Sequence, residues 1–358
     1  MREPPLDAGR AFAWRDGERL IRFGAGVLAE APDLLEQRGF TDFALLTTPR
    51  ALVGSAAASP LAGRAAVVLH VPAGRVPEAA AEVRDGTGGR SLVALGGGRV
   101  IDSAKAIAGA DRLECAALPT TLSGAPMTPF HRMPAGVDDW SLVRPSLVVA
   151  EPGVMASQPL EQLAASAMNA LAHAVEALYA PGANPVAEMA ALRAAELFAH
   201  GLSADPPDRD TVSLAALLGG YAVGSAGFAI HHAVCQTIVR VCGTPHAETN
   251  AVMLPRFVAA MAERAPREMG ALAGALGAGA AAPGGPGPGD ATPADPTTAA
   301  TEVARLAALS GATTLGQLGV RAAQLSELVS EALAHPAAMN TPRPLDADEL
   351  STVLEAAL

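Results

Sequence analysis

The sequence predicts a chain of two domains, an α/β domain with a mostly parallel sheet followed by an all-helical domain. Its 358 residues exceed what one hydrophobic core usually accommodates. Up to residue 152, short β-rich runs alternate with helical stretches, the pattern of parallel strands joined by crossover helices. After Pro152 the β-rich runs stop. We therefore expect domains at residues 1–152 and 153–358.

The predicted elements follow from this patterning. The β-rich runs are Asp42–Thr48, Ala65–Val71, Ser91–Leu95 and Ser146–Ala150. The long helical patterns, which contain few breakers, are Pro159–Ala180, Pro185–His200, Thr211–Ala226 and Ala247–Arg264. Residues 282–298 (APGGPGPGDATPADPTT) are too rich in proline and glycine for a helix or strand. They predict a flexible surface insertion.

Charge and hydropathy exclude two classes of partner. The 25 basic and 36 acidic residues give a net charge of −11, so no basic surplus is available for nucleic-acid phosphates. No apolar stretch reaches the roughly 18 to 20 residues of a membrane helix, and residues 1–10 lack a signal core. Cys115, Cys235 and Cys242 form no disulfide or metal-knuckle pattern. We expect a cytoplasmic protein whose partner is a small-molecule substrate.

A glycine triplet follows the third β-rich run. It consists of Gly96, Gly97 and Gly98. A strand that ends in glycines and turns into a helix brings backbone N–H groups close to an anion, which predicts binding of a nucleotide pyrophosphate. A tight turn that needs glycine for steric reasons is the alternative. Asp102 and Lys105, on the following helix, fit either cofactor binding or a surface ion pair.

Paired threonines form a second polar motif. Thr120 and Thr121 follow a short apolar run, so their hydroxyls are available to a ribose or phosphate at the edge of a sheet. An ordinary polar loop is the alternative interpretation. The two motifs gain weight when they are combined with a set of histidines further along the chain.

The histidine set lies in the second predicted domain. Asn169 and His173 are four residues apart, which places them on one helix face, and His231-His232 and His246 follow. An aspartate at 169 would complete a site of one carboxylate and three imidazoles for a divalent metal. An amide oxygen is a much weaker ligand, so the sequence predicts the pocket without the metal. Hydrogen-bonded core histidines are the alternative.

Together these motifs resemble the iron-containing alcohol dehydrogenase superfamily, which has the dehydroquinate synthase-like fold, and within it the maleylacetate reductase branch. The resemblance runs from Phe23-Gly24-Ala25-Gly26 to Asn340-Thr341-Pro342-Arg343-Pro344. Its most specific stretches begin at Asn169, His231 and Pro245 and read NALAHAVEALYAP, HHAVC and PHAET. The resemblance implies a nucleotide-binding α/β domain, a helical C-terminal domain, an active site in the cleft between them, and a homodimer.

The resemblance also implies roles for individual residues. In metal-dependent relatives, the positions of Asn169, His173, His232 and His246 hold the ion, whereas maleylacetate reductases commonly have Asn at the first position and need no metal. That branch uses NADH or NADPH to reduce the carbon–carbon double bond of maleylacetate to 3-oxoadipate. Freed from metal, the three histidines are available to bind the substrate or donate a proton. Arg343 is the expected partner of a substrate carboxylate.

Three departures from the family pattern bear on this expectation. Arg99 replaces the usual serine after the glycines, where it either strengthens phosphate binding or fills the phosphate site itself. Ala125-Pro126 replaces Ser-Glu. Gln236 replaces a histidine expected near the nicotinamide, and glutamine orients a substrate but exchanges no proton at neutral pH. No acidic residue follows Thr47-Thr48 to bind a ribose diol, so the sequence does not select NADH or NADPH.

We therefore predict two sets of site residues. The catalytic set is Asn169, His173, His232, Gln236, His246 and Arg343. The cofactor set is Gly96, Gly97, Gly98, Arg99, Asp102, Lys105, Thr120 and Thr121.

Three functional hypotheses follow. The favoured one is a metal-independent NAD(P)H-dependent reductase of an unsaturated or oxo carboxylate, because the glycine triplet and the paired threonines are retained. In the second, the fold serves a non-redox cyclisation, dehydration or isomerisation, for example in a biosynthetic pathway, or a binding role, and the nicotinamide site is degenerate. The third, a metal-dependent alcohol dehydrogenase, requires Asn169 as an amide ligand and ranks last.

Overall fold

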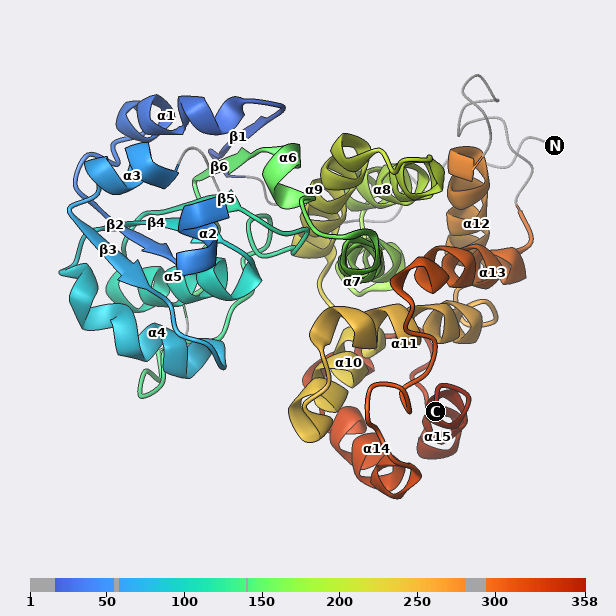
Figure 1. Ribbon diagram of the computed structural model, residues 1–358. Coiled ribbons are helices and arrows are strands. Elements are labelled where there is room, and N and C mark those ends of the chain that lie inside the picture. The colour runs from blue at the N-terminus through green and yellow to red at the C-terminus, as the bar shows by residue number, and fades with distance from the viewer. Residues whose placement is uncertain (1–16, 55–57, 140, 281–293) are drawn as a thin grey trace. The chain divides into compact units, whose positions relative to one another are not determined.

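The computed structural model describes residues 17–54, 58–139, 141–280 and 294–358 (Figure 1). The chain divides into two compact units, Gly17–Ser157 and Gln158–Leu358. The predicted boundary after residue 152 falls at the first residue of the short helix α6 (Pro152–Met155). Each unit is described by itself below.

The first unit is built on a six-stranded parallel sheet with strand order β1-β6-β5-β4-β2-β3. The strands are β1 Leu20–Phe23, β2 Phe43–Thr47, β3 Val67–His70, β4 Ser91–Gly96, β5 Cys115–Pro119 and β6 Leu147–Ala150. The four predicted β-rich runs are confirmed as β2, β3, β4 and β6. The pattern missed β1, a half-exposed edge strand, and β5, whose two alanines have low strand propensity.

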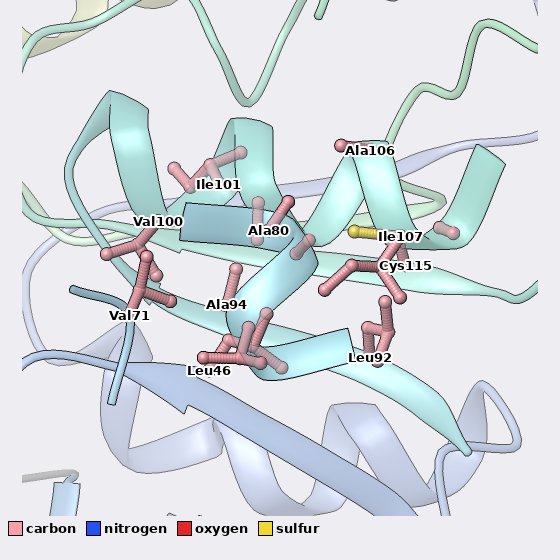
Figure 2. Close-up of a cluster of buried hydrophobic side chains, with 14 of the residues drawn as sticks. Leu46, Val71, Ala80, Leu92, Ala94, Val100, Ile101, Ala106, Ile107 and Cys115 are labelled. Carbon is pink, nitrogen blue, oxygen red and sulfur yellow. The ribbon is translucent and has the colours of Figure 1, made fainter. Parts of the chain in front are cut away.

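Helices cover both faces of this sheet. They are α1 Ala31–Gln37, α2 Pro49–Gly54, α3 Ala58–Arg64, α4 Val76–Arg84 and α5 Gly98–Asp111, with the 3₁₀ turns η1 Val27–Glu30 and η2 Asp85–Thr87. Alternate residues of β4 enter two separate cores: Val93 packs with α1 and α3, whereas Leu92 and Ala94 pack with α4 and α5 (Figure 2). Burial of both faces explains the continuous apolar character of the central strands.

The described residues of the second unit form helices joined by loops, with no β-strand. Its elements are α7 Leu160–Tyr179, α8 Pro185–Ser203, α9 Arg209–Ala226, α10 Ile230–Cys242, α11 His246–Met261, α12 Pro266–Ala280, α13 Pro296–Ala307, η3 Ala308–Ser310, η4 Ala322–Gln324, α14 Leu325–Leu333, η5 Pro336–Met339 and α15 Ala347–Glu355. The four predicted helices are confirmed as α7, α8, α9 and α11. Among the described residues no single helix has the length and apolarity to cross a membrane; α9 and α10 meet those criteria only as a pair bent by 104°.

The end of the predicted 282–298 insertion is helical, which corrects the prediction for residues 296–298. Pro296 occupies the first turn of α13, and the side chain of Asp295 accepts a hydrogen bond from the Thr297 N–H at 2.9 Å. This N-cap starts the helix despite the proline-rich composition, because proline is favoured in a first turn. The insertion as far as Pro293 lies outside the described residues.

Helix α7 forms the centre of the second unit and packs against α8, α9 and α11. Nearly all of its residues from Leu163 onward are buried. Small residues allow this close packing. A Cβ atom at Gly219 of α9 would lie 2.7 Å from the carbonyl oxygen of Ala170. The close approach matters for function because α7 carries Asn169 and His173.

We expect Gly219→Ala to lower the free energy of unfolding by about 1–3 kcal/mol, because the added methyl group meets backbone that cannot rotate away. Gly274→Ala, within α12, is the matched control. Its Cβ meets no atom within 4 Å, so the alanine stabilises the helix by up to about 1 kcal/mol. Urea unfolding of both variants measures the difference. Equal effects would contradict the packing described for α7 and α9.

Candidate active site

The glycine turn and the paired threonines lie side by side in the first unit. Gly96 at the end of β4 is in register with Pro119 at the end of β5, and the Thr120 N–H donates to the Gly96 carbonyl at 3.0 Å. A Cβ at Gly97 would lie 3.1 Å from Thr121 Cγ2. The threonine segment therefore forms one wall of the glycine turn.

This turn has the features of an anion site. Gly97 caps α5 without a side-chain hydrogen bond, so the first N–H groups of the helix have no partner within it. A Cβ at Gly98 would lie 3.1 Å from Ser123 Oγ, a buried hydroxyl with no hydrogen-bond partner. Arg99 is exposed in the first turn, and Asp102 is partly exposed one turn later. The first N–H groups of α5 and the Ser123 hydroxyl are therefore able to hydrogen-bond to an anion.

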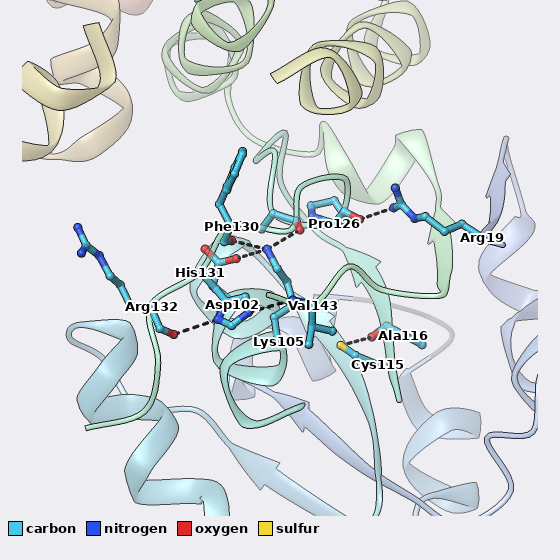
Figure 3. A network of polar contacts seen from close by, with 11 residues as sticks. Arg19, Asp102, Lys105, Cys115, Ala116, Pro126, Phe130, His131, Arg132 and Val143 are labelled. Carbon is cyan, nitrogen blue, oxygen red and sulfur yellow. Dashed lines mark hydrogen bonds and ion pairs between the residues drawn. The ribbon is translucent and has the colours of Figure 1, made fainter. Parts of the chain in front are cut away.

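Lys105 does not fit either predicted role, cofactor contact or surface ion pair. Its side chain is fully buried, and Nζ donates to Asp102 Oδ1 at 2.8 Å, the Ala125 carbonyl at 3.0 Å and the Phe130 carbonyl at 2.6 Å (Figure 3). An ammonium group has three protons, so none remains for a cofactor phosphate. Lys105 therefore holds the protein structure behind the glycine turn and does not line the surface of the turn.

The second unit brings four predicted residues together from three helices. Asn169 and His173 lie on one face of α7, His232 lies in the first turn of α10, and His246 begins α11. His246 Nε2 and Asn169 Oδ1 are 3.1 Å apart. The rings of His173 and His232 stack with their centroids 4.8 Å apart, and Phe228 packs against both. Asn169, His173 and His232 are buried, whereas His246 is exposed.

Glu176 is a site residue that the sequence reasoning missed. This fully buried carboxylate lies one turn after His173 on α7, and its Oε2 is 2.6 Å from His232 Nδ1. Its Oε1 accepts the backbone N–H of His232 at 3.1 Å. An ionised Glu176 accepts the proton of Nδ1, and His232 then presents the lone pair of Nε2. The spacing of three residues from His173 was the available signal.

Burial keeps the histidines neutral. It lowers the pKa of His232 to about 3, assisted by neighbouring His246, and the pKa of His231 to about 3, assisted by His232. Burial lowers the pKa of His173 well below its usual value. It raises the pKa of Glu176, while His231 and backbone N–H groups at the start of α10 act in the opposite direction.

Several buried polar atoms in this cluster have no partner. They include His173 Nδ1 and His232 Nε2, on the two stacked rings, and Asn250 Oδ1 beside His246. A buried polar atom without a hydrogen bond costs roughly 1–3 kcal/mol. A ligand that reaches these atoms supplies the missing hydrogen bonds.

Two remaining predicted residues have different locations. Gln236 is half-buried on α10, one turn after His232. Arg343 is exposed, and its guanidinium donates to the Glu263 carbonyl, beyond the C-terminal end of α11. His246 lies at the opposite end of this helix of 16 residues, so roughly 24 Å of helix separate His246 from the end that Arg343 contacts. Arg343 therefore does not fit the predicted carboxylate clamp at the histidines.

The segment before Arg343 reaches the cluster instead. Thr341 Oγ1 accepts the Ile230 N–H at 3.2 Å, and Asn340 Nδ2 donates to the Phe228 carbonyl at 2.9 Å. These contacts fix the start of α10 and the backbone beside the stacked rings. Arg343 adopts a left-handed conformation, with a φ of 45°, and the chain turns away there.

Comparison with known proteins shows which family the chain belongs to. The model of the iron-containing alcohol dehydrogenase family matches residues 19–152, and the model of that family's C-terminal region matches residues 163–358. The chain belongs to the iron-containing alcohol dehydrogenase family. The resemblance and the fold class predicted from the sequence are therefore confirmed.

The relatives of this family member include curated maleylacetate reductases. Maleylacetate reductase 2 of Cupriavidus pinatubonensis is 36% identical over 276 residues, 72% of this chain and 76% of the relative. Maleylacetate reductase of Sphingobium indicum is 31% identical over 356 residues, 94% and 95% of the two chains. The crystal structure of maleylacetate reductase from Agrobacterium tumefaciens matches with a TM-score of 0.81 at 28% identity, over 98% of both chains. These similarities identify this chain as an oxidoreductase.

The neutral buried histidines predict a pH-dependent stability. Below pH 6.5 the unfolded chain binds protons at His231 and His232 that the folded chain does not accept until about pH 3. Stability therefore rises with pH across this window and is lost as the pH falls below 6.5. Each histidine contributes up to about 1.4 kcal/mol per pH unit. Urea unfolding between pH 5 and 8 measures the slope.

His231→Leu removes one of these two groups, so it makes the dependence on pH shallower. His200→Gln, in the last turn of α8, is a histidine substitution outside the buried cluster, and its slope is compared with that of His231→Leu. A slope equal to that of the wild type in His231→Leu would show that this buried ring is not responsible.

Proposed function

We propose that this chain is a metal-independent NAD(P)H-dependent reductase of an unsaturated or oxo carboxylate, with maleylacetate as the first substrate to test. The observation that carries the proposal is the cluster of Asn169, His173, His232 and His246, with its unpartnered ring nitrogens. The maleylacetate reductase relatives support an NAD(P)H-dependent reductase, and they do not favour the non-redox alternative.

The glycine turn fits a dinucleotide. The uncapped N–H groups of α5 and the unpartnered Ser123 Oγ offer hydrogen bonds to a pyrophosphate, and Arg99 adds a positive charge in the same turn. Thr120 and Thr121 line the turn from β5. When bound, NADH or NADPH supplies the hydride for the reduction.

The donor set supports metal independence. Asn169 supplies a neutral amide oxygen, which is already 3.1 Å from His246 Nε2. Among the described histidines, cysteines and carboxylates, Glu176, His231 and His232 form the one group of three or more whose ligand atoms all lie within 4.8 Å of one another. In that group Glu176 is already hydrogen-bonded to His232 Nδ1. The four family positions therefore make a weaker site for a divalent ion than they would with an aspartate at 169, because Asn169 offers only a neutral oxygen.

The histidines suit an oxygen-rich substrate. His232 Nε2 presents a lone pair whose position Glu176 fixes, and His173 Nδ1 lies on the adjacent stacked ring without a partner. A neutral imidazole donates one hydrogen bond and accepts one, so His173 with its proton on Nδ1 donates to a carbonyl or carboxylate oxygen, whereas the Nε2 lone pair of His232 accepts from a hydroxyl group or water. Gln236, one turn further along α10, adds an amide that orients without exchanging protons.

We expect the purified protein, freed of metal by a chelator, to oxidise NADH or NADPH when maleylacetate is added. The decrease in absorbance of the reduced nicotinamide measures the rate. His232→Gln lowers kcat by about 10²–10⁴-fold, because the substitution replaces an imidazole that exchanges protons, and that Glu176 orients, with an amide that does not. His200→Gln retains the wild-type rate. No oxidation of either cofactor by the wild-type protein would refute the proposed function.

Asn169→Asp tests the proposed independence of metal. The substitution restores an anion beside three imidazoles, so we expect the variant to bind near-stoichiometric zinc while the wild-type protein, prepared identically, binds little. Metal analysis of both proteins after purification without chelator measures this. Stoichiometric metal in the wild-type protein would contradict the proposal.

A further inference from the structure

A long connection follows β5 and carries the threonine segment of the glycine turn. Between Pro119 and Leu147 it contains no helix or strand among the described residues. A segment without backbone ladders keeps a fixed position only if other groups satisfy its carbonyl and N–H groups. Side chains from the rest of the first unit hold this connection in place.

Lys105 is the most deeply buried of these side chains. It lies on α5 with no exposed surface, and its ammonium group donates to two carbonyls of the connection, those of Ala125 and Phe130, as well as to Asp102 (Figure 3). The two carbonyls are five residues apart, so Lys105 closes a compact loop onto the helix. Each hydrogen bond is charge-assisted, which makes it about twice as strong as a neutral one.

Two further side chains hold the same connection. Arg19 donates to the Pro126 carbonyl at 2.9 Å and to the Pro145 carbonyl at 3.1 Å. His131 Nε2 accepts the Val143 N–H at 3.2 Å. Arg19 therefore holds the connection both beside Ala125 and at its end, and His131 holds the part that leads into β6. Lys105 alone joins the connection to α5, the helix that begins at the glycine turn, through charged hydrogen bonds within the described residues.

The anchored loop begins next to the residues that line the turn. Ser123, two residues before Ala125, lies against Gly98, and Thr121 lies against Gly97. A shift of the Ala125 backbone therefore moves the wall of the turn. Lys105 itself has no proton to offer a phosphate, because all three are donated within the protein.

We propose that Lys105 is a positioning residue for the dinucleotide, which acts by holding the Thr121–Ala125 wall against the glycine turn. The inference rests on the proposed function, because it assumes that this turn binds NADH or NADPH. Removing the ammonium group leaves two carbonyls and the Asp102 carboxylate without their buried partner. The wall then keeps only the neighbouring anchor from Arg19 to Pro126, so it is more mobile before any cofactor is bound.

Lys105→Met, which keeps the length of the side chain and removes its charge, tests this inference. We expect the Kd for the preferred cofactor to rise about tenfold or more, with kcat at saturating cofactor changed by less than about threefold. We also expect faster hydrogen–deuterium exchange in peptides covering residues 120–131 of the cofactor-free protein. Fluorescence titration and exchange followed by mass spectrometry measure the two effects.

Arg84→Met is the matched control. Arg84 donates to Asp111 at the other end of α5 with an Nε–Oδ1 distance of 3.1 Å, and it does not contact the connection. It should leave both the Kd and the exchange of residues 120–131 unchanged. If Lys105→Met does not fold, Lys105→Gln takes its place. Its uncharged amide keeps hydrogen-bond donors on a shorter side chain, so we expect the same two effects with smaller size.

The outcomes separate the two proposals. An unchanged Kd in the folded variant overturns the inference, and so does a raised Kd without faster exchange, since that result indicates direct contact with the cofactor. An equal loss of affinity in Arg84→Met also overturns it. If the wild-type protein binds neither NADH nor NADPH, the proposed function itself fails.

Discussion

A buried carboxylate holds the histidine cluster in place. Glu176 has no exposed surface, yet it joins α7 to α10 through the ring and backbone N–H groups of His232. Burial raises the pKa of this carboxyl group, and hydrogen bonds from N–H groups at the start of α10 act against that shift. The same contacts fix the orientation of the His232 ring, and with it the position of Nε2.

Small side chains make this arrangement possible. Only 3% of the residues are aromatic, and the helices around α7 are rich in alanine and glycine. Backbones therefore approach closely, as they do where Gly219 meets Ala170. Polar residues on α7 are held by rigid helices on several sides rather than by loops, which favours a site of constant geometry.

The sequence predicted the features that depend on local pattern. Alternation of short runs located β2, β3, β4 and β6, and a spacing of four located Asn169 and His173 on one helix face. It failed where the outcome depends on tertiary contacts. The sequence does not show that Lys105 turns inward toward a loop, or that Arg343 points to the end of α11. Glu176 was overlooked because its partner His232 lies 56 residues away.

The contact between Asn169 and His246 has a consequence for the breadth of substrates. A metal ion requires its ligands within about 0.2 Å of ideal distances, whereas a hydrogen bond is acceptable over roughly 0.5 Å. Two side chains joined at 3.1 Å by a hydrogen bond are therefore able to part slightly at little cost. In the proposed reductase, a site without a coordination sphere would accept related acids of different bulk, because the contact between Asn169 and His246 tolerates a small change in distance.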